Sequence, residues 1–340
     1  MKKRMRMLGI LLCVVLTAGG CGGGDDAGAD VGAMMEGAAA GGSERRELPA
    51  VLRLGEPRFG DLDMMVEQKV IRVVTTYSRT NYFVVGGEPK GATYEGLMQF
   101  EKFLNERLGT GRLKVHVFIV PVHRDELLQA VADGRADIAA ASITVTPERL
   151  EQVDFSDAAV GGISEVLVTG PESPELTNLD DLSGKTVAVR KSSSYYQSLR
   201  ALSDDFHSRG LSPIRIQEVD ERLETEDIME MVGAGTYPLT VADSHIAEFW
   251  GDILAGVEAR EDLAVGTGRS IAWAFRKDSP KLAAEVNAFV KGHKKGTLFG
   301  NILMKRYFEE NKAVRNPLSG SELEKLQRYR AHFEKYAAQY

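Results

Sequence analysis

The sequence predicts an α/β fold in which two similar open sheets are joined by two extended strands. Short β-branched segments alternate with amphipathic segments from residue 70 onward, and the same order of segments then occurs a second time. Alternation of this kind predicts mostly parallel sheets with right-handed crossovers. A single doubly wound enzyme domain is the alternative, but the two repeats are alike in order and the nucleotide-binding glycine motifs are absent.

The first repeat begins with a run of β-branched residues and continues with Leu97, Phe100 and Leu104 at helical spacing. Its predicted elements are a strand at 70–74, a helix at 94–108, a strand at 115–120, a helix at 125–132 and a strand at 137–141.

The second repeat has the same order. Its predicted elements are a strand at 185–189, a helix at 194–202, a strand at 213–219, a helix at 224–232 and a strand at 237–242. Extended segments at 161–169 and 270–275 are the expected crossings between the repeats, and helices at 282–290 and 298–308 follow the second crossing.

These elements predict two lobes that close like a hinge on a ligand held at the carboxyl ends of the strands. Lobe 1 is expected at 67–166 together with 268–312, and lobe 2 at 167–267. The helix-breaking residues around Pro317 separate lobe 1 from a predicted helical tail at 313–340.

The first residues predict export. Basic residues precede a short apolar run, which is typical of a signal peptide at 1–20 rather than a membrane span. The small residues before Cys21 resemble a bacterial lipobox, which implies a lipid on Cys21; a plain signal peptide is the alternative. Residues 21–66 would then hold the lipidated cysteine and a flexible linker. We expect a lipoprotein of the periplasm or cell envelope, at the outer membrane if the host has two.

Composition narrows the function further. The net charge is -7 and no basic run follows the signal, which argues against a nucleic-acid partner. The six histidines show no metal-ligand spacing, and His123 and His245 are better interpreted as surface or packing residues. Cys13 lies in the signal, so Cys21 has no partner for a disulfide and a catalytic thiol is disfavoured. We therefore expect neither a metal nor a cofactor.

The strongest candidate site runs from Ser142 to Arg149. It follows a strand and opens a helix at Pro147, which suits a first helical turn. The hydroxyls of Ser142 and Thr144 share one side of an extended chain. Arg149 offers a planar fork for a carboxylate. The alternative is a capped helix whose arginine pairs with Glu148 or Glu151.

Two further candidates come from the second repeat. Ser193 and Ser194 lie at a strand-to-helix turn, where free amides and hydroxyls favour an anion, although serines there also simply cap helices. Asp243 ends a strand, where it suits an ammonium group or the N-cap of the next helix. Together with Arg149, these residues match the two ends of a zwitterion.

An ordered set of motifs resembles the bacterial extracytoplasmic solute-binding proteins of family 3, over about residues 68–312. The motifs are the helix entry at 91–95, Gly134-Arg135-Ala136-Asp137, Thr146-Pro147-Glu148-Arg149, Val153-Asp154-Phe155-Ser156 and Leu182-Ser183-Gly184-Lys185-Thr186-Val187. The resemblance implies a two-lobed periplasmic-binding-protein-like (type II) fold that binds an amino acid.

The same resemblance implies roles for individual residues. Arg149 would bind the ligand carboxylate with help from Ser142 and Thr144, Ser193 or Ser194 would close from lobe 2, and Asp243 would take the amino group. One departure concerns the stacking aromatic usual just before residue 125, where Arg124 stands instead. The candidates to replace that aromatic are Tyr77, Tyr82 and Tyr94.

Residues 237–249 and the tail at 323–340 are more similar to the non-catalytic N-terminal module of the membrane-bound lytic murein transglycosylase F family. In that family a catalytic glutamate lies just beyond such a tail, whereas this chain stops at Tyr340.

Three functions remain open. The first is a binder of an amino acid or small peptide that feeds an ABC importer permease. The second is a sensor of cell-wall peptides within a truncated transglycosylase-like protein, acting with the cell-wall machinery. The third is an enzyme, which the missing catalytic glutamate and the lack of a placed Ser-His pair disfavour.

Overall fold

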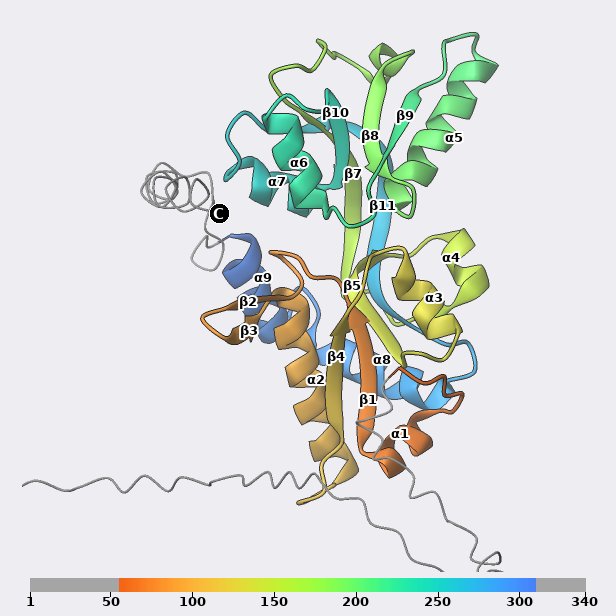
Figure 1. Ribbon diagram of the computed structural model, residues 1–340, viewed down its shortest axis with the longest axis vertical. Coiled ribbons are helices and arrows are strands. Elements are labelled where there is room, and N and C mark those ends of the chain that lie inside the picture. The colour runs from red at the N-terminus through yellow and green to blue at the C-terminus, as the bar shows by residue number, and fades with distance from the viewer. Residues whose placement is uncertain (1–54, 310–340) are drawn as a thin grey trace, which may run out of the picture. The chain divides into compact units, whose positions relative to one another are not determined.

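The computed structural model describes residues 55–309. The predicted signal peptide, Cys21, most of the linker and the tail at 313–340 lie outside these residues. Within the described part, the repeated α/β order is confirmed (Figure 1).

A seven-stranded sheet runs through both lobes in the order β10-β7-β11-β5-β1-β4, with β6 paired to β11. Its strands are β1 (Val70–Thr75), β4 (His116–Pro121), β5 (Ile138–Thr144), β6 (Asp154–Phe155), β7 (Val160–Thr169), β10 (Leu239–Asp243) and β11 (Glu258–Phe275). Strand β1 pairs in parallel with both β4 and β5, as the predicted crossovers require.

Helices cover both faces of this sheet in lobe 1. On β5, Ile138 and Ala140 pack into one buried cluster, whereas the alternating Ala139 and Ala141 pack into another. Such burial on both faces explains why the first four residues of the strand, 138–141, are all apolar. The lobe 1 helices are α1 (Leu62–Gln68), α2 (Ala92–Leu108), α3 (Glu126–Ala132), α4 (Pro147–Gln152), α8 (Pro280–His293) and α9 (Leu298–Phe308).

Lobe 2 adds a parallel pair, β8 (Thr186–Arg190) with β9 (Arg215–Val219), next to β10. The Thr240 hydroxyl of β10 donates to the Ala188 carbonyl of β8, 2.7 Å away. The helices of this lobe are α5 (Ser194–Ser208), α6 (Thr225–Gly233) and α7 (Ser244–Gly251). The exact lobe boundaries, 67–166 with 268–312 and 167–267, stay predictions.

Strand β7 matches the predicted first crossing at 161–169, whereas β11 is much longer than the predicted second crossing at 270–275. Strands β7 and β11 pair antiparallel over much of their length and bond to β10 on one side and β5 on the other. The expected open sheets are therefore joined into one mixed sheet. Strand β11 begins at Glu258, well before the predicted start at residue 270. The prediction missed its first half because that half is charged, partly exposed and interrupted by register shifts, which hide the strand pattern.

Several short elements were not predicted. They are α1, the hairpin of β2 (Phe83–Val85) and β3 (Glu88–Lys90), β6, and the 3-10 turn η2 (Leu179–Leu182). All are short, so hydrophobic periodicity has little length in which to show itself.

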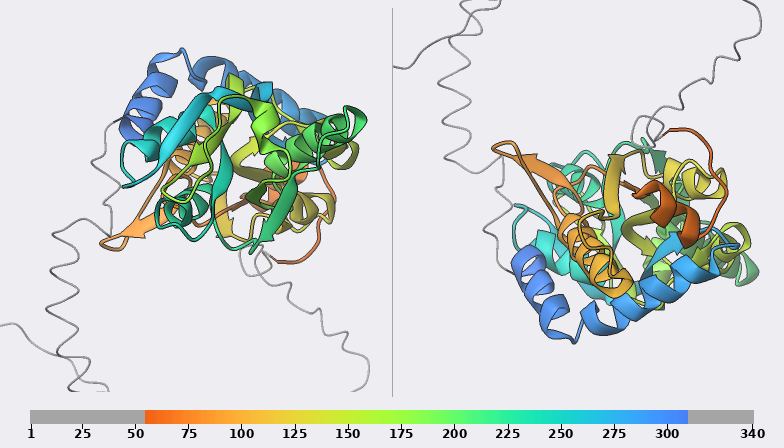
Figure 2. Two further views of the ribbon diagram at one scale, coloured as in Figure 1. Left: turned by 90° about the horizontal axis from the view of Figure 1, so that it is seen from above. Right: turned by 90° about the horizontal axis from the view of Figure 1, so that it is seen from below.

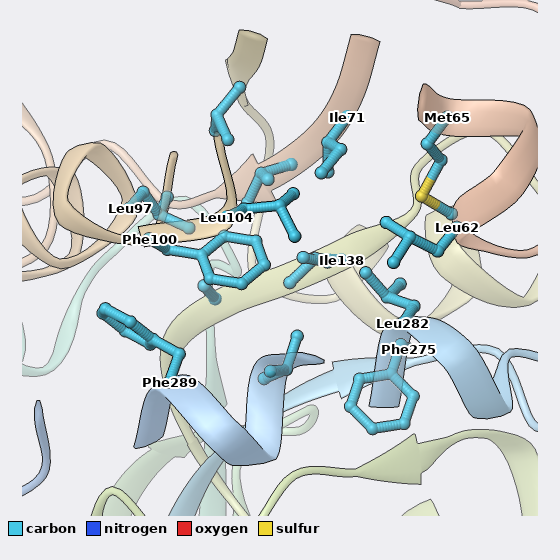
Figure 3. Close-up of a cluster of buried hydrophobic side chains, with 14 of the residues drawn as sticks. Leu62, Met65, Ile71, Leu97, Phe100, Leu104, Ile138, Phe275, Leu282 and Phe289 are labelled. Atoms are coloured by element: carbon cyan, nitrogen blue, oxygen red, sulfur yellow. The ribbon is translucent and has the colours of Figure 1, made fainter. Parts of the chain in front are cut away.

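The lobe 1 core lies between the sheet and helices α1, α2 and α8 (Figure 3). Phe100 of α2 is fully buried and meets Phe289 of α8 edge-to-face, with ring centroids 5.4 Å apart. Helices α2, α8 and α9 contact one another, and the right panel of Figure 2, seen from below, shows them near one another. This cluster fixes α8 to lobe 1 although α8 comes late in the described chain, whereas α9 contacts α2 and α8 on one side and α7 of lobe 2 on the other.

We expect Phe100→Ala to lower the free energy of unfolding by about 3–5 kcal/mol, because it opens a cavity in this core. Urea unfolding of the purified protein measures the change. Leu298→Ala is the control, since Leu298 is 81% exposed and its loss should cost less than about 0.5 kcal/mol. Equal effects of the two variants would contradict this account of the core.

Candidate functional site

A narrow cavity of about 40 Å³ lies between the lobes. Seven of the predicted ligand-binding residues line it: Arg124, Ser142, Thr144, Arg149, Ser193, Ser194 and Asp243. The other lining residues are Thr80, Asn81, Arg190, Tyr195, Glu224, Thr225, Glu226 and Ile246. The structure thus brings together residues from both repeats that the sequence assigned to one site.

Arg149 is positioned by its own helix. The Thr146 hydroxyl accepts from the Arg149 backbone N–H at the start of α4, and the guanidinium donates to the Thr144 carbonyl at 2.6 Å. It also donates across the cleft to the Ser192 carbonyl at 2.8 Å. Within residues 55–309 it makes no ion pair with Glu148 or Glu151, so the alternative of a local pair is wrong.

Burial and the neighbouring Arg124 lower the pKa of Arg149 to about 10. The guanidinium stays charged at neutral pH, but it is destabilised by a second cation and only partly offset by Asp243. An added carboxylate would relieve this excess positive charge.

Ser142 does not lie in extended backbone as expected, since its φ is 50°. A non-glycine residue in this left-handed region is uncommon and is often found at functional sites. The Ser142 hydroxyl donates to the buried Asn81 side chain at 3.0 Å. Both Ser142 and Thr144 still line the cavity, although the expected alternation of the chain does not place them there.

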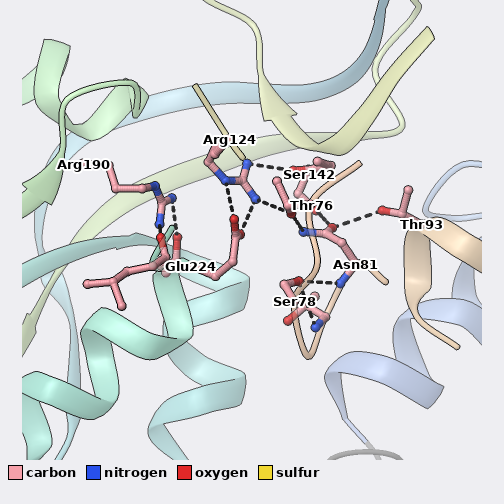
Figure 4. Close-up of polar contacts among 12 residues, drawn as sticks. Thr76, Ser78, Asn81, Thr93, Arg124, Ser142, Arg190 and Glu224 are labelled. Atoms are coloured by element: carbon pink, nitrogen blue, oxygen red, sulfur yellow. Dashed lines mark hydrogen bonds and ion pairs between the residues drawn. The ribbon is translucent and has the colours of Figure 1, made fainter. Parts of the chain in front are cut away.

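Arg124 joins the two lobes through Glu224, which precedes α6 (Figure 4). Its Nε and Nη2 atoms lie 3.1 and 2.5 Å from the two carboxylate oxygens, and Nη1 donates to the Ala141 carbonyl at 2.9 Å. Burial opposes ionisation of Glu224, but Arg124 outweighs it and lowers the Glu224 pKa. Arg124 therefore occupies the expected aromatic position with an ion pair between the lobes.

A second contact between the lobes lies beside the cavity. Arg79 of lobe 1 donates to Glu230 at 2.6 Å and to Asp227 at 3.3 Å, both on α6. Its guanidinium also lies 4.8 Å from the Trp250 ring centroid, within cation–π range. These contacts fix where α6 lies against lobe 1.

Asp243 ends β10 and is 3% exposed. Its side chain does not cap α7, and its Oδ1 has no hydrogen-bond partner within the described residues. Burial and the carboxylate of Glu165, directly opposite on β7, raise the pKa of Asp243 to about 7. This buried acid is thus prepared for a cation rather than used for helix capping.

Ser193 serves the turn as well as the cavity. Its hydroxyl accepts from the Tyr196 backbone N–H as the N-cap of α5 and donates to the Arg190 carbonyl at 2.7 Å. Arg190 in turn donates to the Leu223 carbonyl and to the Thr225 hydroxyl. The capping interpretation of Ser193 is therefore correct, while Ser194 lines the cavity from the first position of α5.

The three tyrosines considered as replacements for the missing aromatic lie elsewhere. Tyr82 contacts the rings of Tyr77 and Tyr94, with centroids 6.3 and 6.1 Å away. Tyr82, Tyr77 and Tyr94 are outside the group of residues that line the cavity. Sequence reasoning also missed Glu224 and Glu226, because acids at a helix start look like ordinary capping residues.

Metal-binding and membrane-spanning features were also considered. Within residues 55–309, histidine, cysteine and acidic side chains form no group that could hold a metal ion. The same residues contain no helix both long and apolar enough to cross a membrane.

Comparison with known proteins assigns the chain to a family. The model of the bacterial extracellular solute-binding proteins, family 3, matches residues 70–310. The chain belongs to this family. The cavity lies where the family resemblance predicted a ligand, between two lobes and at the ends of β5 and β10.

Several sequence relatives of this chain are called membrane-bound lytic murein transglycosylase F. The protein of Desulfosudis oleivorans is 28% identical over 242 residues, covering 70% of this chain and 48% of the relative. That of Shewanella halifaxensis is 28% identical over 274 residues, covering 78% and 53%. This chain therefore spans about half the length of the relatives it matches.

Solved structures confirm the fold. The substrate-binding protein of an amino acid ABC transporter has a TM-score of 0.56 at 21% identity, covering 71% of this chain and all of that chain. AbpA from Streptococcus pneumoniae, bound to L-arginine, has a TM-score of 0.60 at 17% identity, covering 75% and 100%. The predicted two-lobed type II fold is thus confirmed.

The raised pKa of Asp243 predicts a dependence of stability on pH. Because the folded protein holds this proton up to about pH 7 and the unfolded chain releases it near 4, Asp243 favours folding at low pH. That contribution falls between about pH 4 and 7. We expect Asp243→Asn to raise the free energy of unfolding at pH 8 by about 1–3 kcal/mol.

Thermal and urea unfolding from pH 5 to pH 8 measure this effect. The gain from Asp243→Asn should shrink toward pH 5, where the native carboxyl is already protonated. Asp252→Asn, at the end of α7, provides the control. If the increase in the free energy of unfolding did not change with pH, Asp243 would not have the raised pKa that this account requires.

Proposed function

We propose that this protein is a receptor of the cell envelope that closes its two lobes on a zwitterionic amino acid or small peptide. One observation carries the proposal: Arg149 of lobe 1 and Asp243 of lobe 2 line the same buried cavity. Their opposite charges complement the carboxylate and the ammonium group of such a ligand.

The carboxylate end would be held mainly by Arg149. Its guanidinium suits two parallel hydrogen bonds, and Ser142 and Thr144 line the same cavity. The ligand would compete with the carbonyls of Thr144 and Ser192, which now accept from this side chain. Since a carboxylate is a stronger acceptor for a guanidinium than a neutral carbonyl, the exchange is favourable.

The ammonium end would be held by Asp243 from lobe 2. A cation beside its free Oδ1 would lower the Asp243 pKa and ionise the acid, so binding releases protons near neutral pH. Because Arg149 and Asp243 lie on different lobes, a ligand that meets both favours the closed arrangement over an open one.

The chemistry of the cavity supports binding rather than catalysis. The Ser192 hydroxyl donates to Glu221 at 2.5 Å, and that of Ser193 to the Arg190 carbonyl. Histidine and cysteine are missing from the residues that line the cavity within the described chain. The serines of this loop therefore have no histidine beside them, and the Ser192–Glu221 pair lies outside the residues that line the cavity.

A second function is favoured by the named relatives. They are lytic murein transglycosylases, and this chain matches about half of each. The cavity would then bind cell-wall peptides and report to the wall machinery instead of an importer permease. Both functions use the same Arg149 and Asp243 site, and they differ in the length of the ligand.

We expect Arg149→Ala to abolish binding of the ligand. A thermal-shift screen with the common L-amino acids and with cell-wall stem peptides identifies that ligand first. At about 100 times its dissociation constant, the ligand should stabilise the wild type by about 2.7 kcal/mol. Stabilisation by stem peptides alone would favour the sensor, and stabilisation by free amino acids would favour the importer receptor.

Arg200→Ala is the matched control, since Arg200 is exposed on α5 outside the cavity. It should keep the full shift. If Arg149→Ala also kept it, the proposed site would be wrong. Release of sugars from peptidoglycan by the purified protein would contradict the proposal of a non-catalytic binder.

Envelope attachment has its own test, because the predicted lipid acceptor Cys21 lies outside the described residues. We expect cells fed a labelled fatty acid to label the wild type and not Cys21→Ala. Cys13→Ala is the control and should keep the label, since Cys13 lies within the predicted signal. Labelling of Cys21→Ala would exclude this anchor.

A further inference from the structure

Three buried polar atoms of the cavity wall have no hydrogen-bond partner within residues 55–309. They are Oδ1 of Asp243, Oε1 of Glu226 and Nε of Arg190, and each of these residues is 3% exposed. Buried polar groups are nearly always paired, because an unpaired one loses its hydration without compensation. A ligand that fits this wall should therefore supply a partner to each.

The two carboxylates lie at different points of the wall. Asp243 ends β10 and interacts electrostatically with Arg149, the proposed site of the ligand carboxylate. Glu226 lies in the first turn of α6, beside the Arg124–Glu224 pair and Arg79. One acid thus belongs to the zwitterion end, and the other to the end where the ligand side chain would lie.

Helix α6 itself does not need the Glu226 carboxyl. Its capping box is formed by Glu224 and Asp227, whose side chains bond to the backbone at the helix start. Arg79 donates to Asp227 and Glu230 instead of Glu226. The fold has therefore buried a carboxyl that its local structure leaves unused.

Burial and the adjacent Glu224 raise the pKa of Glu226 to about 7. A neutral or anionic ligand side chain would leave the buried Glu226 carboxyl without a cation of its own, because Arg124 is paired with Glu224 and Arg79 with Asp227 and Glu230. A positively charged side chain would balance it, by the same physics that suits Asp243 to the ammonium group.

We propose that the ligand carries a second cationic group, which Glu226 accepts, so that the receptor selects diamino acids or peptides that contain one. The inference rests on the proposed function, because Arg149 and Asp243 still hold the zwitterion end. Arg190 and Arg149 together would face the carboxylate, and Glu226 would determine specificity at the far end. The ligand class is thereby narrowed from any zwitterion to a dibasic one.

Matched pairs of probes test the proposal by calorimetry on the full chain. L-Lysine is compared with L-norleucine, which has the same carbon chain without the terminal ammonium, and alanyl-lysine with alanyl-norleucine. We expect the lysine-containing member to bind at least about 30-fold more tightly, because a buried charged hydrogen bond is lost in the other. This comparison needs only the wild type.

Glu226→Gln then assigns the effect. It should reduce binding of the lysine probe by at least about 30-fold and so abolish the preference for lysine over norleucine. Glu218→Gln is the control, since Glu218 is an exposed acid of β9 outside the cavity, and it should preserve the preference.

The outcomes separate this inference from the proposed function. Equal binding of both members of a pair, lost in Arg149→Ala, would overturn the diamino preference and support the zwitterion site. Tighter binding of L-glutamate than of L-lysine would also overturn the preference, since Arg124 would then bind the carboxylate of the ligand side chain. If no probe binds, both proposals fail.

Discussion

The antiparallel pairing of β7 with β11 is the constraint on which the rest of the structure depends. These two strands continue from lobe 1 into lobe 2, so each lobe builds its sheet on a shared pair. On one side, Asp243 of β10 lies opposite Glu165 of β7; on the other, Thr144 of β5 lies opposite Ile271 of β11. Both walls of the cavity are thus held in register by the same two strands, and a small change in their twist would move one wall against the other.

Direct contacts between the lobes contribute to the free energy of the closed arrangement. Arg124 and Glu224 form a buried two-pronged ion pair, and Arg149 reaches the Ser192 carbonyl. Taking such charges out of water is costly, and the pair recovers that cost only through close geometry. Under the proposed function, a ligand would gain affinity by offering Arg149 a stronger acceptor than a carbonyl, while the Arg124–Glu224 pair holds the lobes together. The closing free energy is therefore shared between protein contacts and ligand contacts.

Some of the buried groups that line the cavity destabilise the folded protein. Asp243 stands against Glu165, whose other contacts are with Ser198 and Arg269, and both carboxylates are almost fully buried. Glu226 repeats this arrangement on α6. Burial and a neighbouring carboxylate raise the pKa of Asp243 and that of Glu226 to about 7, which destabilises their ionised forms in the absence of a cation. A lower free energy of unfolding is a common cost of burying ionisable groups at a functional site.

The sequence by itself determined the elements whose signals are local. The β-α repeat, the helix opening at Pro147 and the place of Arg149 follow from periodicity and capping within a few residues. Only the tertiary structure decided that Arg124 meets Glu224, 100 residues away, and that Glu226 lines the cavity while Tyr82 does not. An acid in a first helical turn has the same local pattern whether it faces water or a buried wall. The difference arises from how the lobes pack, and that packing depends on contacts too distant in sequence for local patterns to record.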